Sequence, residues 1–186
     1  TGSIDQFTGL AAITSRWELW QAAPAWFWTW SILFSRLWSV LFVVATVYVV
    51  YRTCVEAYDR VAGRYAAILL SLSLGSIEVA HEAGEDAPLL FLTAVIIYLS
   101  IRYVRSGNRQ LFFIGCAVGG LATAFKFSGG IAAVLLGSAY LVRTVSNSDE
   151  RLVDIRLLAG GLVIAFALFY VGFAAVVFGG PGVLYD

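Results

Sequence analysis

The chain has 186 residues, of which 60% are hydrophobic and 13% charged, and its mean hydropathy is +0.84. A soluble domain averages roughly 45–50% apolar and about 25% charged residues and needs that charge on its wetted surface, so this composition excludes a soluble globular domain. Basic and acidic residues number 12 each, and because no basic stripe is present we expect no nucleic-acid partner. The apolar residues fall in blocks of helical length, which predicts an all-α, polytopic transmembrane helical bundle.

Residues 1–35 are expected to form an outer loop with interfacial, aromatic-rich helices that lead into the first span. Five of the six tryptophans lie in this segment, and tryptophan is enriched where its ring sits at the level of the lipid headgroups. The alternative is a seventh hydrophobic segment, against which Arg16 and Pro24 argue. The chain contains no methionine and opens without a signal-peptide pattern, so we expect it to be part of a longer protein.

Residues 36–186 are predicted to form the transmembrane helical domain. Several of its apolar blocks are shorter than the ~20 residues that span ~30 Å of hydrocarbon, but flanking Tyr and Arg side chains can extend a short span by reaching to the interface. We therefore expect about six spans. The blocks run approximately over 36–51, 65–80, 87–101, 111–125, 129–142 and 157–178.

The basic residues indicate how these spans are oriented. If the blocks alternate in direction, the loops 52–64, 102–110 and 143–156 lie on one side and hold nine of the twelve basic residues. Short basic loops stay cytoplasmic. We therefore expect a multi-pass protein of the plasma membrane with its acidic loops outside.

Small residues recur within the apolar blocks. Gly115 and Gly119 form a Gly-x-x-x-Gly pair, and glycine doublets stand at 119–120, 129–130 and 160–161. In bilayers such residues let helices approach closely, so we expect them at helix contacts. The doublet at 129–130 would also ease a tight turn between two spans.

An acidic turn lies between the second and third blocks. Carboxylate oxygens suit a hard divalent ion such as Mg²⁺ or Mn²⁺, so Glu85 and Asp86, with Glu82, are candidate metal ligands. The alternative is a solvated turn in which Asp86 caps the next helix and Pro88 occupies its first turn. The turn and the residues before it hold four carboxylates and the only histidine of the chain, namely Glu78, Glu82, Glu85, Asp86 and His81.

Lys126 is the only lysine of the chain and lies on the predicted outer side, between Phe125 and Phe127. A lysine at this position can bind a lipid phosphate as a point charge while its stem lies in the apolar boundary. The alternative is an anchoring lysine that reaches to the interface.

These residues carry a family resemblance. The stretch VAHEAGEDAPLLFL, with His81, Asp86 and Pro88 opening a span, and the later stretch GLATAFKF, which ends a span around Lys126, resemble the polyprenyl-phosphate-sugar-dependent glycosyltransferases of the GT-C superfamily. The nearer similarity is to the protein mannosyltransferase and aminoarabinose transferase-like enzymes, over roughly residues 36–145.

The resemblance implies transfer of a sugar from a polyprenyl-phosphate carrier to a protein, lipid or glycan acceptor on the non-cytoplasmic face. His81 and Lys126 would bind the lipid phosphate, and Glu85 and Asp86 would hold a metal or orient the donor. In the family the catalytic acid is usually an Asp in an acidic pair after the first span. The early candidate is Asp5, whose neighbour Gln6 departs from the Asp-Glu pattern, so we expect that pair and the first span to lie outside this chain.

Two other functions fit the sequence. A transporter or channel subunit would be favoured if Glu78 lay deep and faced a water-filled path, because acidic residues within membranes often mark ion paths. A non-catalytic membrane subunit or truncated paralogue would be favoured by the absence of the first span and its acidic pair.

Overall fold

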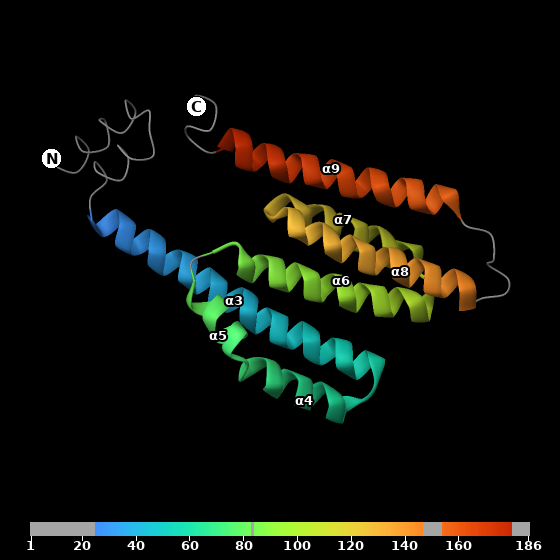
Figure 1. Ribbon diagram of the computed structural model, residues 1–186, viewed down its shortest axis with the longest axis horizontal. Coiled ribbons are helices and arrows are strands. Elements are labelled where there is room, and N and C mark those ends of the chain that lie inside the picture. The colour runs from blue at the N-terminus through green and yellow to red at the C-terminus, as the bar shows by residue number, and fades with distance from the viewer. Residues whose placement is uncertain (1–24, 83, 147–153, 180–186) are drawn as a thin grey trace.

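The computed structural model describes residues 25–82, 84–146 and 154–179, and every regular element within these ranges is a helix (Figure 1). This confirms the predicted all-α class. The elements are α3 (Ala25–Ala57), α4 (Arg60–Ser71), α5 (Leu74–His81), α6 (Asp86–Ser106), α7 (Arg109–Phe125), the 3-10 turn η2 (Phe127–Gly129), α8 (Gly130–Ser146) and α9 (Ile155–Gly179).

The long helices pack side by side as a bundle. In Figure 1, α6, α7, α8 and α9 alternate in direction; α3 lies along α6, and α7 contacts both α6 and α9. The described helix ends that flank the predicted basic loops, where α3, α6 and α8 end, therefore lie at one end of the bundle (Figure 1). We call this the arginine end. The turn before α6 and the turn after α7 meet at the opposite end, which we call the acidic end.

Among the residues that the structure describes, four helical segments are long and apolar enough to cross a membrane: Trp26–Ala57, Asp86–Ser106, Phe127–Ser146 and Ile155–Phe173. A fifth, α7, is apolar but has only 17 residues. In the most apolar stretch of each long segment, no more than 39% of the residues are buried inside the protein. Most of this apolar surface therefore faces outward, as it must where the solvent is lipid rather than water.

The first long helix begins earlier than the sequence suggested. We expected a span from residue 36, but α3 is continuous from Ala25. The segment from Ala25 to Ser35 contains no proline or glycine, so nothing in it interrupts a helix. At 33 residues the helix is about 50 Å long, which exceeds the hydrocarbon thickness. Its first turns carry the exposed rings of Trp26 and Trp30, which suit the headgroup level.

The block expected at 65–80 is two helices rather than one. α4 ends at Ser71 and α5 begins at Leu74, because Ser73 has an extended backbone with φ −67° and ψ 128°. Serine favours helix ends over interiors since its hydroxyl competes for backbone groups, and Gly75 adds a weak helix former beside it. With 12 and 8 residues, neither helix alone reaches the ~20 residues of a span.

Glycines mark the closest helix contacts, as predicted. A Cβ added to Gly120 of α7 would meet the Ala165 carbonyl of α9, and one added to Gly129 would meet the Ala122 carbonyl across the turn. The buried core lies mainly between α6, α7 and α8, where the ring of Phe112 contacts those of Tyr103 and Tyr140 at centroid distances of 5.4 and 5.7 Å.

Contacts between α6 and α8 stabilise the arginine end. α6 ends at Gly107, whose φ of +68° is in the left-handed region that favours glycine. The Arg143 guanidinium of α8 packs against this glycine and donates a hydrogen bond of 3.0 Å to the Val104 carbonyl. A cation beside the last carbonyls of a helix is favourable, so this contact stabilises the end of α6.

Candidate functional site

Lys126 stands at the acidic end, between α7 and η2. Its backbone is extended, with φ −156° and ψ 135°, and this conformation ends α7. The turn is closed by a hydrogen bond of 2.8 Å from the Gly129 N–H to the Lys126 carbonyl. Because Gly129 has no side chain, this turn can approach the Ala122 carbonyl closely. The turn thereby places the lysine side chain at the rim of the bundle.

The Lys126 ammonium binds two carboxylates at the start of α6. Its Nζ lies 2.8 Å from Asp86 Oδ1 and 3.8 Å from Glu85 Oε1. The three side chains are between 43% and 56% exposed, so the cluster remains accessible from outside. We call Lys126, Glu85 and Asp86 the acidic-end cluster.

Asp86 does not cap α6, which corrects one expectation. The helix begins at Asp86, its N-cap position is Glu85, and the Glu85 side chain makes no capping hydrogen bond. Both carboxylates instead turn to Lys126, while their position at a helix N-terminus also favours negative charge. Pro88 lies within the first turn, as expected, where its missing N–H costs nothing.

The cluster shapes the electrostatics of Lys126. The hydrogen bond from its ammonium to Asp86 and the charge of Asp86 raise the pKa of Lys126 above its ordinary value, and Glu85 adds to this effect. The lysine is therefore a permanent cation at physiological pH. An ammonium has three N–H donors, so Lys126 can bind another oxyanion beside Asp86 or in its place.

His81 and Glu82 lie in the same turn region but outside the cluster. His81 is the last residue of α5, and its Nδ1 lies 2.7 Å from the Ile77 carbonyl one turn earlier. The Glu82 backbone N–H donates to the Glu78 carbonyl, which completes the end of α5. Within the described residues, no hydrogen bond or ion pair joins either side chain to Lys126.

The described residues include no group of three or more His, Cys, Asp or Glu side chains placed to hold a metal ion. Glu85 and Asp86 face the Lys126 ammonium, and Glu82 does not join them. A divalent ion at Glu85 and Asp86 would have to displace this lysine. A metal bound by Glu82, Glu85 and Asp86 therefore stays a prediction, and no chemical step below depends on it.

Two other sequence candidates can be placed. Asp5, the early acidic candidate, lies outside the described residues. Glu78 is exposed on the short helix α5, and the transporter hypothesis stays a prediction because this exposure does not give its depth in a membrane. We did not predict from the sequence that Lys126 and Asp86 pair directly. Their placement on the same predicted membrane face was a signal that could have indicated the contact.

Outward-facing apolar helices and an exposed ion cluster at one end together define a polytopic integral membrane protein with a candidate anion site at its surface. Comparison with known families is more specific. The profile of the dolichyl-phosphate-mannose-protein mannosyltransferase family matches residues 22–173, and the chain belongs to this family. Searches of curated proteins and of solved structures gave no match.

Family membership confirms the resemblance inferred from the His81 and Lys126 segments, and the match covers residues 22–173 rather than the expected 36–145. It implies a membrane glycosyltransferase activity of the GT-C kind, with a polyprenyl-phosphate sugar as donor and a glycosylation acceptor. The acidic-end cluster lies inside the matched range.

Proposed function

We propose that this chain provides the donor-binding part of a membrane glycosyltransferase that transfers a sugar from a polyprenyl-phosphate carrier to an acceptor on the non-cytoplasmic face. One observation carries the proposal: the accessible Lys126 ammonium, held 2.8 Å from Asp86 at the end of the bundle opposite the arginine end. A lysine so placed binds phosphate as a point charge, while its neighbouring phenylalanines lie at the apolar boundary through which a lipid carrier arrives.

Binding of the donor adds a third anionic group at Lys126. In the free protein the ammonium is held by Asp86 and Glu85, which fix it at the rim. A lipid phosphate can take one of the remaining N–H donors, and the two carboxylates then keep the lysine in place from the other side. Because the carboxylates repel the phosphate, they also disfavour a second anion and help to release the product.

In the chemical step no covalent bond to these residues forms or breaks. The acceptor oxygen attacks the anomeric carbon, and the bond from that carbon to the phosphate oxygen breaks with its electron pair on the phosphate. The lipid phosphate thus gains one negative charge as it leaves. A fixed ammonium stabilises this developing charge more than it stabilises the bound donor, which lowers the barrier. A general base takes the acceptor's proton; we assign it to no described residue, and Asp5 stays the sequence candidate.

The arrangement of charge supports the face proposed for this reaction. The ends of α3, α6 and α8, which carry Arg52, Arg105 and Arg143, lie at one end of the bundle, and the start of α6 and the end of α7 lie at the other (Figure 1). By the tendency of short basic loops to remain cytoplasmic, the cluster would face the opposite side. A carrier-linked sugar would then be used after it has reached that side.

A transfer assay tests the proposal. The longest natural form of the protein would be incubated with radiolabelled polyprenyl-phosphate sugars, with and without Mg²⁺ or Mn²⁺, and label in the acceptor fraction would be counted. Transfer supports the proposal, and dependence on the ion would support a metal at Glu85 and Asp86. If folded protein transferred label from none of the donors, the non-catalytic subunit would become the better account.

A further inference from the structure

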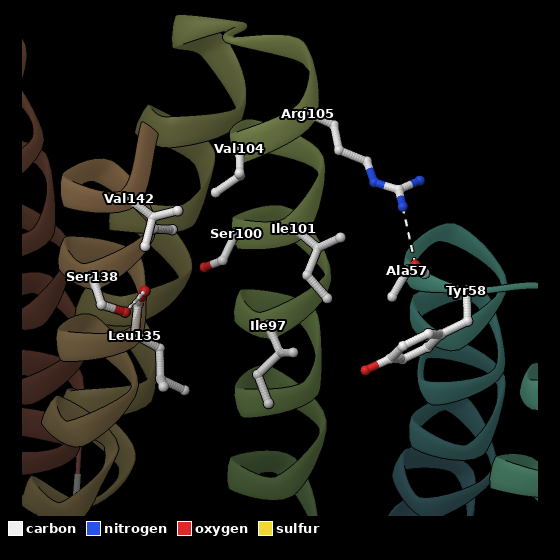
Figure 2. A pocket seen from close by; sticks show the side chains of 11 residues that line it. Ala57, Tyr58, Ile97, Ser100, Ile101, Val104, Arg105, Leu135, Ser138 and Val142 are labelled. Atoms are coloured by element: carbon white, nitrogen blue, oxygen red, sulfur yellow. Dashed lines mark hydrogen bonds between the residues drawn. The ribbon is translucent and has the colours of Figure 1, made fainter. Parts of the chain in front are cut away.

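A second candidate site lies at the arginine end, far from the acidic-end cluster. A cavity of about 490 Å³ opens between α3, α6 and α8, which is within the ~300–1,000 Å³ typical of ligand sites. Figure 2 shows α6 as its floor, with α8 forming one wall and the end of α3 the other. Ile97, Ile101, Leu135 and Val142 supply apolar lining.

Ser100 is the first sign that this cavity takes a ligand with a polar group. Its side chain lines the cavity and points from α6 toward α8 (Figure 2), yet the residue is only 7% exposed and its hydroxyl has no hydrogen-bond partner. Other helical hydroxyls bond the carbonyl four residues earlier, as Thr46 and Thr53 do. A buried hydroxyl without a partner is costly, so an acceptor supplied by a ligand would stabilise it.

Arg105 is the second sign, because it places positive charge at the mouth of the cavity. Its guanidinium crosses from α6 to donate one hydrogen bond of 3.0 Å to the Ala57 carbonyl (Figure 2), and it forms no ion pair within the described part of the chain. A guanidinium has five N–H donors, so several remain for an anion. Asp59, two residues beyond Ala57, accepts a hydrogen bond from the Ala62 N–H and caps α4.

We propose that this cavity binds an anionic phospholipid. The phosphate lies at Arg105, the acyl chains lie along the apolar floor, and a glycerol-ester carbonyl accepts from Ser100. The spacing fits this arrangement, since five residues of helix separate Ser100 from Arg105 by about 7.5 Å along the axis, and in a bilayer the ester carbonyls lie below the phosphate. Basic pockets between membrane helices are a recognised way to bind anionic headgroups. This site is independent of the proposed sugar transfer.

Native mass spectrometry of the full chain in detergent tests the site, with phosphatidylglycerol and phosphatidylcholine as probes. We expect phosphatidylglycerol to be retained preferentially and Arg105→Gln, which keeps an amide donor for Ala57, to weaken it roughly five- to tenfold. Arg102→Gln is the matched control, because Arg102 lies on the same helix but stacks over the Tyr98 ring; it should change binding less than twofold by the same charge reasoning.

Two further variants separate a lipid site from a general surface effect. Val142→Trp would fill the cavity from a half-exposed position and abolish retention, whereas Val145→Trp, on the exposed surface of the same helix, would not. Ser100→Ala should weaken lipid binding roughly threefold without lowering the thermal stability of the lipid-free protein. Equal retention of the two lipids, equal effects of the two arginine variants, or cross-linking of the cavity to a protein segment in place of a photoreactive lipid would overturn the proposal.

Discussion

Lys126 and Asp86 are forty positions apart in the chain, yet the Lys126 Nζ and Asp86 Oδ1 atoms lie 2.8 Å apart. This contact joins the end of α7 to the start of α6 and leaves both side chains about half exposed. It brings together the two segments on which the family resemblance rests. The proposed donor site is this contact together with Glu85.

Removing the charge of Asp86 should impair transfer more than it impairs folding. In Asp86→Asn the ammonium loses its closest charged partner and is no longer held at one position, which we expect to lower kcat/KM by roughly 10- to 100-fold. The melting temperature should change little, because exposed ion pairs contribute little to stability. Glu78→Gln is the matched control, since Glu78 is an exposed carboxylate on the neighbouring helix α5 and its side chain has no described contact with Lys126. An equal loss of transfer in both variants would mean that Asp86 has no specific role.

The raised pKa of Lys126 sets the pH range of its ion pair. Because the folded pKa lies above the ordinary value of 10.5, the stabilising contact is fully present below pH 10.5 and is lost as the pH rises through the folded value. The Lys126 contribution to donor binding should therefore stay constant from neutral to mildly alkaline pH. Lys126→His would replace it with a group of pKa about 6.5, so donor binding should then weaken as the pH rises through that region. Binding of a non-transferable donor analogue, measured against pH, compares the two; identical profiles would count against Lys126 as the phosphate ligand.

Gly107→Ala should destabilise the arginine end. A side chain at a φ of +68° costs about 1–2 kcal/mol, and its Cβ would also meet the Arg143 guanidinium. Gly137→Ala provides the contrast, because a Cβ there meets nothing within 4 Å and alanine is favoured over glycine in a helix by about 1 kcal/mol. Thermal unfolding in detergent should show opposite shifts for the two variants, and a shift of the same sign in both would contradict this account of α6.

Single cysteines introduced at the two ends test the orientation of the bundle. With Cys54 and Cys116 replaced, Gly84→Cys at the acidic end should react with a membrane-impermeant thiol reagent from outside intact cells. Gln110→Cys, in the first turn of α7, should react only after the cells are opened. Both positions are exposed, so access to the reagent is not limited by packing. Labelling of both from the same side would refute the alternation of spans.

The helical class and the grouping of charges were predictable because they depend on local sequence. Apolar blocks of about the length that spans a bilayer predict helices regardless of how those helices pack. The arginines recur in alternate loops, and this pattern can also be read without knowing which helices are in contact. The starting point of α3 was missed because its aromatic residues suit both an interface and a span. The break at Ser73 was missed because the hydropathy of the block hides a change in the backbone of one residue.

The pairings within the sites could not be predicted in the same way. Lys126 and Asp86 meet because α6 and α7 pack with their ends in register, and this register depends on contacts between the two helices, such as that of the Tyr103 ring with the Phe112 ring. The unpartnered hydroxyl of Ser100 is likewise a property of the packed bundle, since in sequence it is one serine among many in apolar helices. The metal ligands inferred from the acidic turn remain a prediction for the same reason: residues adjacent in sequence need not converge.

The most direct test of the central claim is sugar transfer from a polyprenyl-phosphate donor by the longest natural form of the protein, compared between wild type, Lys126→Arg and Lys126→Ala. If Lys126 stabilises the leaving phosphate, the alanine variant should lose about 100-fold or more in kcat, and arginine, which keeps the charge, should restore part of it. Folded Lys126→Ala protein that transfers sugar at the wild-type rate would contradict the claim.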